Sequence, residues 1–166
     1  MRELRPLAAL GLLIRVVAAA IWLVAGAAKV GELQHFHAQV DQYKLLPHAL
    51  EAPFAYALPF VELFVGLYLL IGLLTRVAGI AACVLMVLFL IAQIQAWARG
   101  LSLDCGCFGA LAQEQVGLGS VLRDVALGVP SLVMALRPAR ALSLDSYLLG
   151  VPDDFAGARS ATSESG

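Results

Sequence analysis

Two cysteines one residue apart, Cys105 and Cys107, are the side chains of this sequence best suited to chemistry. They lie within residues 103–109, a polar and reactive segment in a strongly apolar chain. A disulfide between them would close a smaller ring than a Cys-x-x-Cys pair, and small rings force the torsion angle and the Cα spacing away from their optimum. Strained, accessible disulfides are the labile, oxidising or catalytic ones. The pair therefore indicates a thiol–disulfide redox switch.

The residue between the cysteines favours the same interpretation. Gly106 has no Cβ to crowd so tight a turn. Two structural alternatives stay open, namely a static disulfide that locks the loop and two thiols without a chemical role. Thiol reactivity depends on exposure and on the local environment, which the sequence does not show. The sequence also leaves open which cysteine is the nucleophile.

The composition places these cysteines in a membrane protein. Of the 166 residues 61% are hydrophobic and only 14% are charged, whereas a soluble domain has about 25% charged residues. The deficit extends over long apolar runs, which is typical of an integral membrane protein. The net charge of −1 gives no sign of nucleic-acid binding.

Four apolar segments are long enough to cross a bilayer, since about 20 helical residues are needed. These predicted spans are residues 7–28, 52–74, 77–98 and 120–136. Between the first two, apolar residues at 33, 36, 40 and 43 follow the three-four spacing of an amphipathic helix, which Pro47 should end. Such a helix can lie flat on the membrane surface. The predicted fold class is all-α: an integral membrane four-helix transmembrane bundle with an extracytoplasmic amphipathic linker helix.

The distribution of basic residues predicts the orientation. With four spans, both termini and the link at 75–76 share one side. That side holds Arg2, Arg5, Arg76, Arg137 and Arg140. The positive-inside rule then places both termini in the cytoplasm. The cysteine loop and the linker helix face the opposite compartment, where disulfides persist. The membrane domain is expected to cover residues 1–137, and residues 138–166 are expected to form a cytoplasmic, largely disordered tail.

Several polar side chains fall inside the predicted spans. Glu62 should lie roughly 12–15 Å from the end of its helix, where an ionised carboxylate is costly unless it is paired or solvated. Lys29 and Arg123 are candidate partners, and Gln93 and Asp124 are expected nearby. Two interpretations stay open: a polar pocket for a small ligand, such as a quinone head group, and an internal ion pair that fixes the helix register.

The histidines were considered as metal ligands. His35, His37 and His48 are expected on the same side of the membrane as the cysteines. His35 and His37 are two residues apart, and on a helix they point in different directions. Because this spacing does not suit zinc or copper, no metal site is predicted.

Short motifs follow one another along most of the chain. They are Gly26-Ala27-Ala28-Lys29, Tyr43-Lys44-Leu45-Leu46-Pro47, Leu58-Pro59-Phe60-Val61-Glu62, Gly72-Leu73-Leu74-Thr75-Arg76, Asp104-Cys105-Gly106-Cys107-Phe108-Gly109 and Arg123-Asp124. This series resembles the MauE branch of the DoxX-like membrane proteins over about residues 8–136. The Cys-Gly-Cys-Phe-Gly element is the most specific part of the resemblance.

The resemblance implies a four-helix bundle in the bacterial cytoplasmic membrane with a redox-associated role. In this family MauE is linked to maturation of the disulfide-rich small subunit of methylamine dehydrogenase, beside a thioredoxin-like partner. Other DoxX-like proteins are tied to quinone-linked sulfur oxidation, which makes a quinone a candidate cofactor. The expected partners are an extracytoplasmic thioredoxin-like protein or disulfide-containing client, and membrane lipid.

The function predicted from the sequence is a membrane-embedded thiol–disulfide redox protein. It would support disulfide formation in an extracytoplasmic client, or that client's maturation, through Cys105 and Cys107, with Lys29, Glu62 and Arg123 lining a pocket below. Whether it is an enzyme stays open. The alternative is a non-enzymatic membrane subunit or assembly factor with a structural disulfide and a pocket for lipid or a small molecule. A third option is a small-molecule carrier that uses the Glu62 pocket.

Overall fold

The computed structural model describes residues 4–101 and 115–137 of the chain. In these ranges it consists of five α-helices without β-strands: α1 (Leu4–Gly31), α2 (Leu33–Tyr43), α3 (His48–Ile71), α4 (Thr75–Ala98) and α5 (Leu118–Leu136). All but α2 contain a segment long and apolar enough to cross a membrane. The predicted all-α membrane bundle is therefore confirmed. Cys105, Cys107 and the tail predicted for residues 138–166 lie outside the described residues.

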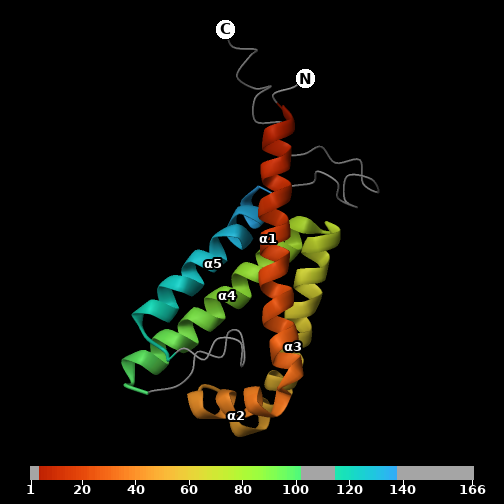
Figure 1. Cartoon of the computed structure of the whole chain (residues 1–166). Helices are drawn as coiled ribbons and strands as arrows, with labels where there is room; N and C mark the ends of the chain where they lie inside the picture. Colours follow the sequence, from red (N-terminus) through yellow and green to blue (C-terminus); the bar gives the residue numbers. More distant parts are fainter. Residues whose placement is uncertain (1–3, 102–114, 138–166) are drawn as a thin grey trace.

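The four long helices form two closely packed pairs (Figure 1). α1 packs chiefly on α3 and α4 chiefly on α5, while contacts between α1 and α5 and between α3 and α4 join the two pairs. α2 lies across one end of the bundle and packs mainly on α3. We refer to this end as the α2 end. α1 and α4 finish there and α3 and α5 begin there, so the ends of the helices that flank the cysteine segment lie at the α2 end.

Glycines bring the paired helices close together. A Cβ added at Gly26 or at Gly66 would lie 2.9 Å from backbone atoms of the partner helix, on α3 and α1 respectively. A Cβ added at Gly79 would lie 2.7 Å from the backbone nitrogen of Ala135. Real side chains do not tolerate such distances, so these glycines allow α1 to pack on α3, and α4 on α5, at short range.

The outer surface of the bundle is apolar. Large hydrophobic side chains are exposed on each long helix, for example Leu13, Phe64, Val77 and Leu122. A soluble monomer rarely exposes large contiguous apolar patches, because water would not solvate them. The buried core between the helices instead contains many small residues around Trp22. This distribution suits a bundle whose outer face contacts lipid.

The helix boundaries differ from the predicted ones at the α2 end. α2 ends at Tyr43 because Lys44 adopts a left-handed conformation with φ of 48°. Pro47 is extended and forms the N-cap of α3, so it begins the next helix rather than ending α2. This use suits proline, whose fixed φ is tolerated where a helix starts. At the opposite end, Gly72 closes α3 with φ of 74°, which a residue without a Cβ adopts readily.

Candidate functional site

A fully buried ion pair joins α1 to α3 near the α2 end. The Lys29 Nζ donates hydrogen bonds of 3.0 and 2.9 Å to the two carboxylate oxygens of Glu62. Both side chains have 0% exposure. The pair forms because Gly26, one turn before Lys29, lets α1 approach α3 closely. Each charge thus has its counter-charge in a region that water does not reach, which limits the cost of burying both.

Two aromatic rings enclose the ammonium group of Lys29. The Nζ lies 5.5 Å from the ring centre of Phe36 on α2 and 5.2 Å from that of Phe89 on α4. Cations are attracted to aromatic rings at such distances. Lys29 therefore connects α1 with α2, α3 and α4, which fixes the position of α2 across the end of the bundle.

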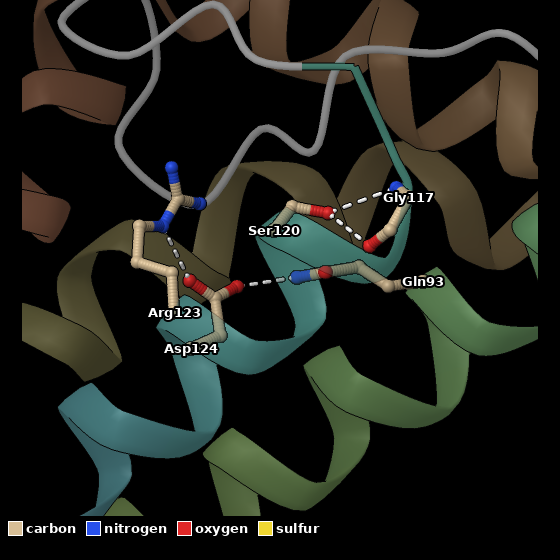
Figure 2. A network of polar contacts seen from close by, with 5 residues as sticks. All are labelled: Gln93, Gly117, Ser120, Arg123 and Asp124. Carbon is tan, nitrogen blue, oxygen red and sulfur yellow. Dashed lines mark hydrogen bonds and ion pairs between the residues drawn. The ribbon is translucent and has the colours of Figure 1, made fainter.

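A second polar network joins α4 to α5 (Figure 2). The Asp124 carboxylate accepts a hydrogen bond from the Gln93 Nε2 and one of 3.0 Å from the Arg123 Nε. Asp124 and Gln93 are buried, whereas the Arg123 side chain is 27% exposed. The structure thus pairs Glu62 with Lys29, and Arg123 with Asp124. All four long helices contribute to these two networks.

The beginning of α5 is fixed by a serine in its first turn (Figure 2). The Ser120 Oγ accepts a hydrogen bond of 3.0 Å from the Gly117 N–H and donates one of 2.9 Å to the Gly117 carbonyl oxygen. Gly117 is the N-cap and α5 starts at Leu118, two residues before the start of the predicted span 120–136. The serine satisfies backbone groups that a helix end otherwise leaves without partners.

The two networks share a small cavity. Lys29, Glu62 and Asp124 line it together with apolar side chains that include Trp22 and Phe89. Its volume is about 20 Å³, which is room for about one water molecule. In this arrangement an organic ring fits beside Glu62 only if the helices separate.

A much larger cavity lies between α2, α3 and α4. Its volume is about 360 Å³, and its walls are mostly apolar side chains of these helices and of the α2–α3 link. Phe89 and Gln93 line it as well, so this cavity adjoins both polar networks. The sequence did not reveal it, because α2 has to fold back across α3 and α4 before the space exists.

The described residues that flank the cysteine segment are anchored at the α2 end. Arg99, directly after α4, donates a hydrogen bond of 2.9 Å from Nη1 to the carbonyl oxygen of Tyr43 at the end of α2. Tyr43 and Leu101 also pack against a small apolar cluster of Ala96 and Val116. The segment that carries Cys105 and Cys107 therefore begins and ends next to α2, although both cysteines lie outside the described residues.

The three histidines have different neighbours. The His35 Nε2 and the Gln39 Nε2 are 3.2 Å apart, and the ring of His37 stacks on Tyr56. His48 pairs with Glu51 and lies 4.0 Å from an oxygen of Asp41. These last three residues offer ligand atoms within 4.8 Å of one another. This cluster could not be read from the sequence, because the turn between α2 and α3 brings Asp41 close to His48 and Glu51.

The sequence also missed one hydrogen bond across the bundle. The Trp22 Nε1 on α1 donates a hydrogen bond of 3.0 Å to the Ser131 Oγ on α5. Both side chains are buried. A tryptophan in an apolar run gives no sign of its partner, so only the rotation of both helices reveals this contact.

Comparisons with known proteins identify the family. A family model described as methylamine utilisation protein MauE matches residues 7–137. The MauE of Methylophilus methylotrophus is 37% identical over 133 residues, which cover 76% of this chain and 70% of that protein. The MauE of Paracoccus denitrificans is 29% identical in a match that covers 74% of this chain and 66% of that protein. The MauE of Methylorubrum extorquens is 32% identical in a match that covers 72% of this chain and 66% of that protein. No solved structure gives a significant match. This chain is a membrane protein that belongs to the MauE family.

Proposed function

We propose that this protein is a membrane-embedded thiol–disulfide redox protein that supports disulfide formation in an extracytoplasmic client, or the client's maturation, through Cys105 and Cys107. The observation that carries the proposal is the Cys-Gly-Cys sequence between α4 and α5 in a chain of the MauE family. The relatives are named methylamine utilization proteins. By extension, the client takes part in methylamine utilisation and contains disulfides.

The reaction requires only the two sulfurs and a client dithiol. A client thiolate attacks one sulfur of the Cys105–Cys107 disulfide, a mixed disulfide forms, and the other sulfur leaves as a thiolate. The second client thiol then attacks the mixed disulfide. The client leaves oxidised, and Cys105 and Cys107 remain as two thiols that hold the two electrons and two protons. A Cys-x-Cys disulfide closes a small, strained ring. Oxidation of the client opens this ring, so the strain favours that direction of the reaction.

The geometry at the α2 end supports this placement. Cys105 follows Leu101 by four residues, so the chain length keeps it within about 14 Å of that residue. Leu101 packs against the same small apolar cluster as Tyr43 of α2, and the buried Lys29–Glu62 pair holds α1 and α3 together at this end. Reactive groups are held best when the supporting elements are rigid. The two polar networks supply that rigidity below the cysteine segment.

The proposed orientation places the α2 end outside the cytoplasm of a bacterial cell. Five basic residues near the ends of the spans fall on the opposite side, namely Arg2, Arg5, Arg76, Arg137 and Arg140, against Lys29, Lys44 and Arg99 at the α2 end. The positive-inside rule assigns the side with more basic residues to the cytoplasm. The α2 end then faces a compartment in which disulfides persist and a thioredoxin-like partner or an oxidisable client is accessible. The two termini are cytoplasmic in this proposal.

A second candidate function is a non-enzymatic membrane subunit or assembly factor. The observation that favours it is the water-sized cavity beside a fully buried Lys29–Glu62 pair, which suits an ion pair that fixes the helix register. In that case the two cysteines only lock the segment between α4 and α5. The same cavity volume disfavours a carrier that binds its cargo at Glu62.

Single cysteine variants separate these candidates. We expect Cys105→Ser and Cys107→Ser each to abolish client oxidation in cells while the amount and the elution profile of the folded protein stay unchanged. Cys83→Ala is the matched control, because Cys83 lies within α4 among the membrane-spanning residues and should not be needed. If client oxidation continues in Cys105→Ser and only thermal stability falls, the structural candidate is correct and the redox proposal is refuted.

A further inference from the structure

The cavity between α2, α3 and α4 has the size and the walls of a ligand site. Its volume of about 360 Å³ lies within the range of small-molecule pockets, about 300–1,000 Å³. Its walls include the exposed side chains Leu88 and Ile91, so the cavity opens toward the outer, apolar surface of the bundle. The cavity lies at the α2 end, where α2 crosses the long helices, so it is close to the expected membrane surface.

The polar groups of this cavity are uncharged. Three glutamine side chains, Gln39 on α2 and Gln93 and Gln95 on α4, line it together with Tyr43, and its described lining includes no acidic or basic residue. A phospholipid head group carries charge and would need cationic partners. The lining therefore suits a neutral ligand with an apolar body and a polar head that forms hydrogen bonds.

One wall of the cavity holds an acceptor that lacks a donor. Gln39 is only 7% exposed, and no described residue donates a hydrogen bond to its Oε1. The Nε2 of the same amide lies 3.2 Å from the Nε2 of His35, which positions the side chain. Buried polar atoms nearly always have a partner, and Gln39 lines the cavity, so a rotation of this amide toward the cavity would let a ligand supply the missing donor.

The carboxamide group also limits the class of ligand. It contains both an N–H donor and a carbonyl acceptor, so it can bond to a ketone oxygen in one orientation and to a hydroxyl group in the other. A quinone presents the ketone and its reduced quinol presents the hydroxyl. Both are neutral, and both carry an apolar tail that enters from the lipid phase.

We infer that this cavity binds a lipid-soluble quinone, which reoxidises the cysteine pair. This inference rests on the proposed function, because it names the electron acceptor of that reaction. The thiols of Cys105 and Cys107 transfer two electrons and two protons to the quinone, the S–S bond re-forms, and the quinone leaves as quinol. The location fits, since Tyr43 lines the cavity and packs against the same apolar cluster as Leu101, after which the cysteine segment begins.

Binding of decylubiquinone to the purified full chain in detergent micelles tests the site. Ala92→Phe places a ring in the cavity, because Ala92 lines it, and should weaken binding at least tenfold. Gln39→Leu removes one hydrogen bond and should weaken binding about threefold to tenfold. Val84→Phe is the control: it also places a phenyl ring on α4, but at a residue that is 53% exposed and outside the cavity lining, and it should leave the affinity unchanged.

The binding experiment tests the quinone site separately from the thiol–disulfide reaction of the proposed function. In the double variant Cys105→Ser, Cys107→Ser we expect decylubiquinone to bind as in the wild type, because the described lining that recognises the ligand is unchanged. Failure of the thiol reaction would thus leave binding intact. The site is refuted if Ala92→Phe and Gln39→Leu both bind like the wild type. It is also refuted if decylbenzene, which has a tail but no quinone oxygens, competes equally well, or if the wild type binds no decylubiquinone because residues 102–114 occupy the cavity.

Discussion

The Lys29–Glu62 pair provides the sharpest stability prediction. Glu62→Gln removes the anion and leaves the Lys29 ammonium group at 0% exposure. Breaking a buried pair by removing one partner costs about 3–5 kcal/mol, because an uncompensated charge remains in a medium of low dielectric. The rings of Phe36 and Phe89 stay in place and offset part of this cost, by about 1–2 kcal/mol. We therefore expect Glu62→Gln to lose about 1–4 kcal/mol of unfolding free energy.

Removing both charges should restore most of that loss. Lys29→Met should be destabilising by itself, because it leaves the Glu62 carboxylate buried without a cation. The double variant Lys29→Met, Glu62→Leu contains no buried charge at this position, and replacement of buried pairs by apolar residues is often neutral or stabilising. We expect it to unfold within about 1 kcal/mol of the wild type. The single and double variants then show strong non-additivity, as residues in direct contact do.

Reversible unfolding in mixed detergent micelles, followed by tryptophan fluorescence, measures these free energies. Trp22 lines the same small cavity as the ion pair and should report its loss. Glu32→Gln is the matched control, since Glu32 is exposed and the same change there should cost less than about 0.5 kcal/mol. Two results would contradict this explanation of the α2 end: Glu62→Gln loses no more unfolding free energy than Glu32→Gln, or the losses of the two single variants simply add in the double variant. Either result would mean that Lys29 and Glu62 do not form a desolvated pair.

Three further predictions follow from helix contacts, each measured by the same unfolding experiment. Gly79→Ala should cost about 1–3 kcal/mol of unfolding free energy, because its Cβ would meet the α5 backbone. Gly31→Ala is the control: its Cβ would have nothing within 4 Å, so the change should be less than about 1 kcal/mol. Equal effects of the two changes would contradict the close packing of α4 on α5. Ser131→Ala should cost about 1–3 kcal/mol because the Trp22 N–H loses its buried acceptor, and a neutral result would contradict that hydrogen bond. Asp124→Asn should cost about 1–3 kcal/mol because the charge that holds Arg123 is lost; no change at low salt would show that this contact is not formed.

The helices could be predicted from the sequence because their signals are local. Long apolar runs exceed the length needed to cross a bilayer, and the three-four spacing of apolar residues around Phe36 indicates an amphipathic helix that packs on one face. The structure confirms both, and Phe36 is buried on the face of α2 that packs on the bundle. Lys29 was one of two candidate partners of Glu62, because only a cation near the same depth could compensate a buried carboxylate.

The features that sequence alone did not give depend on how the helices are rotated. Glycine contacts set the rotation of α1 on α3, and this decides that Lys29 rather than Arg123 reaches Glu62. Gln39 belongs to the polar residues of α2 by type, yet it is buried because α2 crosses the long helices. The large cavity has the same origin, since it forms between three helices that are separate in the sequence. The predicted last span begins at Ser120, two residues late, because a serine at the third position of a helix and one at the N-cap give the same local signal.

The central claim is that Cys105 and Cys107 exchange disulfides with a client outside the cytoplasm. Trapping in intact cells tests it most directly: one cysteine is replaced by serine, free thiols are blocked with an alkylating reagent, and the protein is purified without reductant. We predict that one of the two single variants carries a covalently attached, thiol-bearing protein that reductant releases and mass spectrometry identifies, and that the double variant carries none. If neither single variant holds such a partner while the client still acquires its disulfides, the claim is contradicted.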